Sequence, residues 1–287
     1  MRTLFLSILL VNASLFVGCK KEEVQPNLPV EKIDYSFLVA GHVYGDPQVS
    51  VLGFYPPFKE HFSSIQEQEK IEFAFFTGDV VREASNETQW DSAITDMNTL
   101  GLPYHVAAGN HDRGSVFLER FGEYYYSFQY GQDLFVILNT FQWNIEGEQK
   151  EFLENTLSDL DGIANVFLFS HELIWWSPDS IFQNIGINWI GHYPGSTNYW
   201  SEISPILESA AIPVYLFSGD VGATWASSPY AYYSYENIHF IASGMGYDID
   251  SNYLIVNVYE NNKVKLNLKA IEGDPDRLGD ISLYELP

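Results

Sequence analysis

Acidic, amide and imidazole side chains follow four short apolar segments of this 287-residue chain. The longest polar stretch is Gly109-Asn110-His111-Asp112, and the others are Thr77-Gly78-Asp79, Ser170-His171-Glu172 and Ser218-Gly219-Asp220. Oxygen and imidazole ligands that converge can hold a divalent cation, which polarises a substrate and activates water. The residue types therefore indicate metal-assisted hydrolysis.

The apolar segments are the elements that must position these side chains. Each is bounded by turn residues, as buried strands are, and the four are Phe73–Phe76, His105–Ala108, Asn165–Phe169 and Val214–Phe217. Open α/β sheets place their chemistry at the carboxyl ends of their strands. We therefore expect four strand tips to bring Asp79, Asn110, His171 and Asp220 together.

The rest of the chain alternates predicted strands and helices and then becomes rich in strands. Helical spacing is present in Pro57–Lys70, Glu87–Leu100 and Glu146–Leu160, and near Tyr199–Ser209. The third strand extends over Pro103–Ala108, and further strands are expected at Ile33–Ala40, Tyr124–Tyr130, Leu134–Asn139, Ile238–Ser243, Tyr253–Tyr259 and Val264–Leu268. The pattern predicts an α/β fold without internal repeats.

The order of these motifs resembles that of the calcineurin-like metallophosphoesterase family, from roughly Ile33 to the C-terminus. The tetrad Gly109–Asp112 is its most specific element, because Gly-Asp alone is common. The resemblance implies a two-sheet β-sandwich flanked by helices, a four-layer αββα architecture. It also implies metal-dependent hydrolysis of a phosphomonoester or a phosphodiester.

The resemblance implies one complete metal site. Asp79 matches the acid that bridges two metals in the family, and the other ligands of this site match Asn110, His171 and Asp220. The family has a histidine where this chain has Asp220, so the site is harder and favours Mn²⁺, Mg²⁺ or Ca²⁺ over Zn²⁺, with iron as a further candidate. Two alternatives remain open from the sequence: His171 as a core histidine and Asp220 as a turn residue.

The other metal site is predicted to be incomplete. Here His42 and Asp79 remain, but Ala40 replaces an aspartate of the family and Gly222 replaces a histidine. Asp46 is an acid in the loop after the first strand, and its replacement of the lost carboxylate stays open. The cofactor is therefore expected to be one or two divalent ions.

The resemblance also assigns catalytic and substrate-binding roles. His111 matches the general acid of the family, and Asp112 is expected to orient its ring. Arg82 and Arg113 follow motif loops and either hold a phosphate or pair with an acid. After His171, an aromatic-rich segment either binds substrate over the site or packs onto the body; its candidate ligands are Trp175, Trp176 and His192.

The N-terminus resembles a bacterial lipoprotein signal. Arg2 precedes an apolar segment, Leu4–Val17, which is short for a membrane span and ends near Cys19, the sole cysteine. An ordinary secretory signal is the alternative. We expect a signal peptide at 1–18, a flexible tether at 19–32 and a phosphoesterase domain at 33–287. A lipidated Cys19 would anchor the protein outside the cytoplasm, at the outer membrane or cell surface.

Composition restricts the partners. The formal net charge is −24, from 14 Lys+Arg against 38 Asp+Glu, which disfavours binding to nucleic acids and to anionic lipid surfaces. The expected partners are a small phosphorylated substrate and a membrane reached only through Cys19. The alternative function is a surface lipoprotein that binds a ligand at a degenerate site without hydrolysing it.

Overall fold

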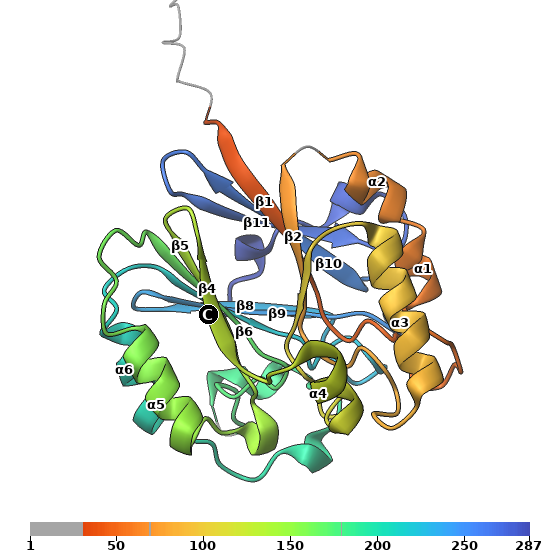
Figure 1. Cartoon of the computed structure of the whole chain (residues 1–287), viewed down its shortest axis with the longest axis horizontal. Coiled ribbons are helices and arrows are strands. Elements are labelled where there is room, and N and C mark those ends of the chain that lie inside the picture. Colours follow the sequence, from red (N-terminus) through yellow and green to blue (C-terminus); the bar gives the residue numbers. More distant parts are fainter. Residues whose placement is uncertain (1–30, 69, 179) are drawn as a thin grey trace, which may run out of the picture. The chain divides into compact units, whose positions relative to one another are not determined.

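A two-sheet sandwich with helices on its outer faces forms the body of the protein (Figure 1). This computed structural model describes residues 31–68, 70–178 and 180–287. The predicted signal peptide at 1–18, most of the predicted tether at 19–32 and the predicted lipidation of Cys19 lie outside these residues. Apolar clusters lie between the sheets and under the helices on both outer faces, so the predicted four-layer α/β fold is confirmed.

The first sheet has the strand order β12-β11-β10-β1-β2-β3. Its strands β1, β2 and β3 are parallel neighbours, so their carboxyl ends share one edge. Strand β10 is antiparallel to β1 on its other side. The strands are β1 (Ile33–Ala40), β2 (Ile71–Phe76), β3 (Tyr104–Val106), β10 (Asn252–Tyr259), β11 (Val264–Ala270) and β12 (Gly279–Asp280).

The second sheet has the strand order β4-β5-β6-β7-β9-β8. Its central strands β5, β6, β7 and β9 are parallel, whereas β4 and β8 are antiparallel edge strands. The strands are β4 (Tyr126–Tyr130), β5 (Asp133–Ile137), β6 (Asn165–Phe169), β7 (Val214–Ser218), β8 (Tyr230–Tyr235) and β9 (Ile238–Ser243).

The helices cover the outer faces of the sheets, with α1–α3 on the first sheet and α5 and α6 on the second (Figure 1). They are α1 (Pro56–Lys59), α2 (Phe62–Gln66), α3 (Glu87–Leu100), α4 (Ser115–Phe121), α5 (Gly147–Thr156) and α6 (Ser204–Glu208). Short 3₁₀ turns span Phe141–Trp143, Ile181–Asn184, Ile190–His192, Pro275–Arg277 and Ile281–Tyr284, and a π-helical turn spans Tyr199–Ile203.

Several elements differ from the sequence-based expectation, among them the short strand β12, which was not predicted. The helix expected over Pro57–Lys70 is two short helices, although the buried side chains of Phe58, Phe62 and Ile65 keep helical spacing. Helix α4 and the edge strand β8 were not predicted. Strand β8 is rich in tyrosine and only partly buried, so its sequence lacks the apolar run that marks the central strands.

Aromatic stacking between the sheets fixes the strands that carry the candidate site. The rings of Phe75 on β2 and Phe169 on β6 stack with centroids 3.9 Å apart and planes 3° from parallel. Phe169 stacks in turn on Phe217 of β7 at 5.1 Å. The loops that follow these strands therefore begin from fixed positions in both sheets.

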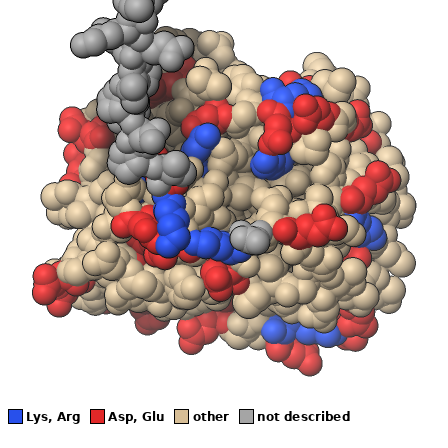
Figure 2. Space-filling view, turned by 90° about the horizontal axis from the view of Figure 1, so that it is seen from above, with Lys and Arg blue, Asp and Glu red and all other residues tan. Residues whose placement is uncertain are grey.

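Figure 2 looks onto the edge of the sandwich where β1 begins, at the end of the strands opposite to their carboxyl tips. Basic side chains there lie next to acidic ones, and the pairs include Lys32 with Glu260 and Lys263 with Glu31. Most of these charges are exposed, so the pairs contribute little to stability. Within the described residues, no helix has the length and hydropathy needed to cross a membrane.

Candidate metal and catalytic site

Four potential metal ligands from four strand tips meet at one edge of the sandwich. His171 Nε2 lies 3.3 Å from Asp79 Oδ1, 3.2 Å from Asn110 Oδ1 and 3.8 Å from Asp220 Oδ1. One ligand atom from each of Asp79, His171 and Asp220 lies within 4.8 Å of the other two. Oxygen ligands bind hard divalent ions at about 2.0–2.6 Å, so all of these atoms can reach a single ion.

The ring of His171 is held with one nitrogen toward the cluster. Its Nδ1 donates to the carbonyl of Thr77 at 2.9 Å, which leaves Nε2 facing the carboxylates. Gly78 makes this contact possible, because a β-carbon there would lie 2.4 Å from His171 Nδ1. Such a backbone contact fixes the tautomer of a metal-binding histidine.

The electrostatics of the cluster favour a cation. Burial alone would lower the pKa of His171, but the charges of Asp79, Asp220 and Glu172 outweigh it and raise that pKa to about 10. Burial raises the pKa of Asp220 to about 8, against the opposing charge of His171. Burial also disfavours the charge of Asp79, yet His171 and His42 hold its pKa well below its usual range. Without a metal, protons on His171 and Asp220 offset the negative charge of the buried carboxylates. The donor set therefore fits a divalent cation, which would replace those protons.

Asp112 connects two site loops instead of orienting His111, so that expectation was wrong. Its Oδ1 accepts hydrogen bonds from the backbone of Val80 and Val81 at 2.9 and 3.0 Å, and its Oδ2 accepts one from Gly109 at 2.8 Å. These backbone donors occupy both oxygens of the buried carboxylate. Asp112 thereby holds the loop after β2 against the loop after β3.

A backbone carbonyl orients His111. Its Nδ1 donates to the carbonyl of Arg82 at 2.7 Å, and its own backbone amide donates to Asp79 Oδ1 at 3.2 Å. The imidazole lines a cavity that the metal ligands Asp79 and Asp220 also line. With Nδ1 engaged, Nε2 is the ring atom left to exchange a proton with a bound ligand.

Neither candidate arginine lines the cavity. The Arg82 guanidinium donates to the carbonyl of Pro47. Arg113 Nη2 donates to both Glu172 oxygens at 2.8 and 2.9 Å, and its guanidinium carbon lies 4.7 Å from the Phe141 ring centroid. The alternative interpretation, pairing with an acid, therefore describes Arg113. Of the two alternatives, phosphate binding is not supported for either side chain, because neither guanidinium lines the cavity.

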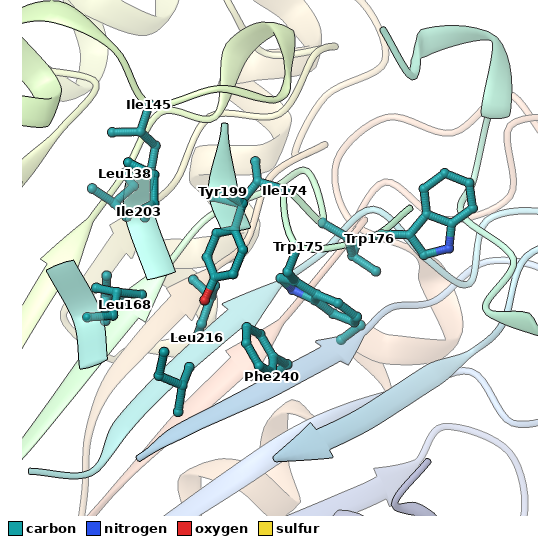
Figure 3. Close-up of a cluster of buried hydrophobic side chains, with 14 of the residues drawn as sticks. Leu138, Ile145, Leu168, Ile174, Trp175, Trp176, Tyr199, Ile203, Leu216 and Phe240 are labelled. Carbon is teal, nitrogen blue, oxygen red and sulfur yellow. The ribbon is translucent and has the colours of Figure 1, made fainter. Parts of the chain in front are cut away.

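The aromatic segment after His171 divides into a buried part and an exposed part. Trp175 is fully buried, with its ring 5.3 Å from that of Phe240 (Figure 3). Trp176 is also buried, and its ring lies 5.0 Å from that of Tyr193. Of the two alternatives, packing onto the body describes these two rings and substrate binding does not, because both belong to the apolar core that covers the second sheet. His192 and Trp189 do line the cavity, whose volume is about 260 Å³.

Comparison with known proteins places the chain in a family. The family model for calcineurin-like phosphoesterases matches residues 42–223. The chain belongs to the calcineurin-like phosphoesterase family. This match includes all the metal-ligand candidates, His42, Asp79, Asn110, His171 and Asp220.

Relatives of this calcineurin-like phosphoesterase share parts of its length. The uncharacterized protein YvnB of Bacillus subtilis is 33% identical over 97 residues, which is 32% of this chain and 7% of that protein. A probable inactive purple acid phosphatase 27 of Arabidopsis thaliana is 24% identical over 152 residues, covering 42% of this chain and 25% of that protein. The purple acid phosphatase PPD1 of yellow lupin has a similar fold, with a TM-score of 0.57 and 15% identity over 84% of this chain and 52% of that one.

The second metal position of this calcineurin-like phosphoesterase retains few ligands. His42 Nε2 lies 3.4 Å from Asp79 Oδ2, and burial lowers the pKa of His42 to about 4. Ala40 is packed in the apolar core, and Gly222 has a φ of 80°. Asp46 Oδ1 accepts the backbone amide of Gln48 at 2.7 Å and does not line the cavity. None of these last three positions supplies a ligand beside His42.

Two further residues of the site were missed by sequence reasoning. Asn188 donates its backbone amide to the Asp220 carbonyl at 3.1 Å and accepts the amide of Ala223 on its Oδ1 at 2.8 Å. Tyr44 lines the cavity, with its ring 4.3 Å from that of His42 and 5.5 Å from that of His111. The place of Tyr44 two residues after His42 was a usable signal, whereas Asn188 lies in a segment without a motif.

Proposed function

We propose that this protein hydrolyses a small phosphorylated substrate, a phosphomonoester or phosphodiester, with the help of a divalent metal. The observation that supports this most is the convergence of Asp79, Asn110, His171 and Asp220 beside a separately held His111. A binding site alone has no need of a proton donor that is oriented through a backbone carbonyl. Family membership supports phosphoester hydrolysis as the class of reaction.

The four ligands would hold one cation at the shared edge of the sheets. When bound, it would supply charge for the phosphate oxygens and acidify water. His111 would protonate the leaving oxygen through Nε2, because Nδ1 is fixed on the Arg82 carbonyl. Asp112 would keep the loops of Asp79 and His111 at a constant separation.

The ligand atoms favour a hard metal ion. Asp79, Asn110 and Asp220 offer oxygen, and His171 alone of the four offers nitrogen. Such a set suits Mn²⁺, Mg²⁺ or Ca²⁺ better than Zn²⁺, while iron remains a candidate. We propose one firmly held ion, with any second ion bound more weakly near His42.

Ligand binding without hydrolysis is the second candidate function. It is favoured by the two positions, Ala40 and Gly222, at which the family's second metal loses its ligands. The two functions predict different turnover for protein in which the site formed by Asp79, Asn110, His171 and Asp220 is fully occupied by metal. A binding protein would retain the metal and a phosphate ligand and yet hydrolyse none of a broad panel of phosphoesters.

The proposed hydrolysis is tested by Asp79→Asn, with Asp46→Asn as the matched control. Asp79 is buried among the ligands, whereas Asp46 caps a nearby turn outside the cavity. Loss of the first metal should lower turnover by about 10³-fold, since a metal contributes several kcal/mol to the transition state. Metal content by mass spectrometry and turnover of aryl phosphoesters are measured together. Equal turnover in both variants would contradict the proposal.

We also propose that Cys19 is acylated and anchors the protein outside the cytoplasm. The support is the short apolar segment Leu4–Val17 that ends close to this single cysteine. The acidic composition disfavours direct adhesion to anionic lipid and to nucleic acids, so the acyl chains would be the contact with the membrane. Cys19→Ser should move the protein from the membrane fraction to the soluble fraction of a bacterial host. Unchanged fractionation would contradict the anchor.

A further inference from the structure

We propose that the substrate is a monoanionic phosphodiester carrying a flat apolar group that stacks on Trp189. This inference rests on the proposed function, because it names the substrate class of the same site. Two independent features of the cavity support it. The first is the charge of its lining, and the second is an exposed indole on a loop that is bonded to Asp220.

Histidines are the only basic side chains that line the cavity in the described part of the chain. Among the described residues, its lining contains the acids Asp79 and Asp220 but no lysine or arginine. Those two carboxylates together balance the charge of one divalent cation. Neither nearby arginine belongs to this lining: Arg113 is paired with the acid Glu172, and Arg82 donates to the carbonyl of Pro47.

Charge balance therefore discriminates between the two ester classes. A phosphomonoester carries close to two negative charges above its second pKa of about 6, whereas a diester carries one. The second charge would enter a cavity whose acids already neutralise one metal, in a chain of net charge −24. Only histidines line the cavity as potential cations, so the diester is the better match.

Trp189 gives this cavity a flat apolar wall. Its side chain lines the cavity and is 63% exposed, unlike the buried Trp175 and Trp176. An exposed indole attracts planar rings by stacking, with little dependence on the identity of the ring. A substituent on phosphorus that extends away from the metal ligands would meet this surface.

The loop that carries Trp189 is tied to the metal ligands. The preceding residue, Asn188, is bonded to the Asp220 carbonyl and to the amide of Ala223. Gly186 is bonded to Ser228 through both backbone groups, with its own amide on the Ser228 hydroxyl at 3.0 Å. The backbone that carries the indole is thus fixed relative to Asp220, as a specificity-determining position requires.

Gly191 leaves the space in which this indole lies. A β-carbon at Gly191 would come within 2.4 Å of Trp189 Nε1, and the backbone of Gly191 is not in the left-handed region. Gly191→Ala is therefore compatible with the local backbone but displaces the ring. It provides a variant that moves the proposed wall without deleting it.

Three p-nitrophenyl esters separate charge from stacking on Mn²⁺-loaded protein at about pH 8, where the monoester is a dianion. They are p-nitrophenyl phosphate, its methyl diester and bis(p-nitrophenyl) phosphate. We expect the methyl diester to exceed the monoester in kcat/KM by about tenfold or more, from charge alone. The second aryl ring should add about another tenfold through Trp189.

Trp189→Ala and Gly191→Ala should lower kcat/KM for bis(p-nitrophenyl) phosphate more than for the methyl diester, so that the advantage of the second ring is lost. Trp225→Ala is the matched control, because Trp225 is 76% exposed on the neighbouring loop but does not line the cavity. Calorimetric binding of diphenyl phosphate to the same metal-loaded variants gives a readout that does not need turnover. It should weaken about tenfold in Trp189→Ala and stay constant in Trp225→Ala.

The outcomes separate this inference from the function on which it rests. Equal or better hydrolysis of the monoester would overturn the charge argument while hydrolysis itself stands. Equal effects of Trp189→Ala and Trp225→Ala would overturn the stacking surface. Trp189-dependent binding of diphenyl phosphate without turnover of any ester would support the ligand class and overturn the proposed hydrolysis.

Discussion

The two sides of Asp79 differ although the same carboxylate serves both. Toward His171 its Oδ1 meets a cluster completed by Asn110 and Asp220. Toward His42 its Oδ2 meets one imidazole at 3.4 Å, and no second carboxylate lies there among the residues that line the cavity. One side of the carboxylate therefore has the donors that a metal ion requires, whereas the other side has too few.

On the side of Asp79 that faces His42, the backbone leaves no space for a further ligand at position 222. Gly222, at the place of a family histidine, has a φ of 80°, and a β-carbon there would lie 2.5 Å from the carbonyl carbon of Gly244. Gly244 in turn packs on the carbonyl of Val221, where its own β-carbon would lie at 2.0 Å. The loops after β7 and β9 therefore lie so close that they leave no room for a side chain at position 222.

The largest predicted effect on turnover comes from a comparison of His111, beside the complete ligand cluster, with His42 on the incomplete side. His111→Ala should lower turnover by about 10²–10⁴-fold, the usual effect of losing a positioned general acid. His42→Ala should lower it by less, because the metal that His42 would bind has few other ligands. Steady-state turnover and metal content are measured on both variants. If His42→Ala is the more damaging, a second metal is essential and the two sides are equivalent in function.

The pH dependence of metal affinity should reveal the protons that His171 and Asp220 hold on the complete side of Asp79. His171 has a pKa of about 10 and Asp220 a pKa of about 8 in the metal-free protein, so both hold protons at neutral pH. A bound metal must displace those protons, and affinity should therefore rise with pH, by about tenfold per unit for each proton released. Titration calorimetry of Mn²⁺ between pH 6 and 8, in buffers of different ionisation enthalpy, measures both the slope and the proton release. An affinity that is flat over this range would contradict the proton-filled cluster.

The smallest predicted effect is on stability, when a histidine is introduced on the incomplete side of the site. Gly222→His restores the family residue but should destabilise the fold by about 1–3 kcal/mol, because a side chain at positive φ meets the Gly244 backbone. We expect a lower midpoint of thermal unfolding and no additional metal. Gly195→His is the control, because Gly195 also has a positive φ, 91°, but a β-carbon there meets no atom within 4 Å. A second bound metal in Gly222→His would show that the loops can separate.

The sequence predicted the strands better than the side-chain directions. Apolar runs such as Asn165–Phe169 determine a buried strand, and a polar residue after a run must lie at its tip, so the ligand cluster was accessible to reasoning. The direction of a ring or a carboxylate depends on distant partners instead. Trp175 was a candidate for substrate contact but packs on Phe240, and Asp112 was expected to orient His111 but binds backbone amides.

The stacked rings of Phe75 and Phe169 have a mechanical consequence. They join β2 of one sheet to β6 of the other, and the same two strands deliver Asp79 and His171. An ion bound by those ligands would link the two sheets of the sandwich, a few residues beyond the aromatic contact. A shift of one sheet relative to the other would increase the distance between Asp79 and His171. A change in the packing of the two phenyl rings would therefore change the affinity for the ion.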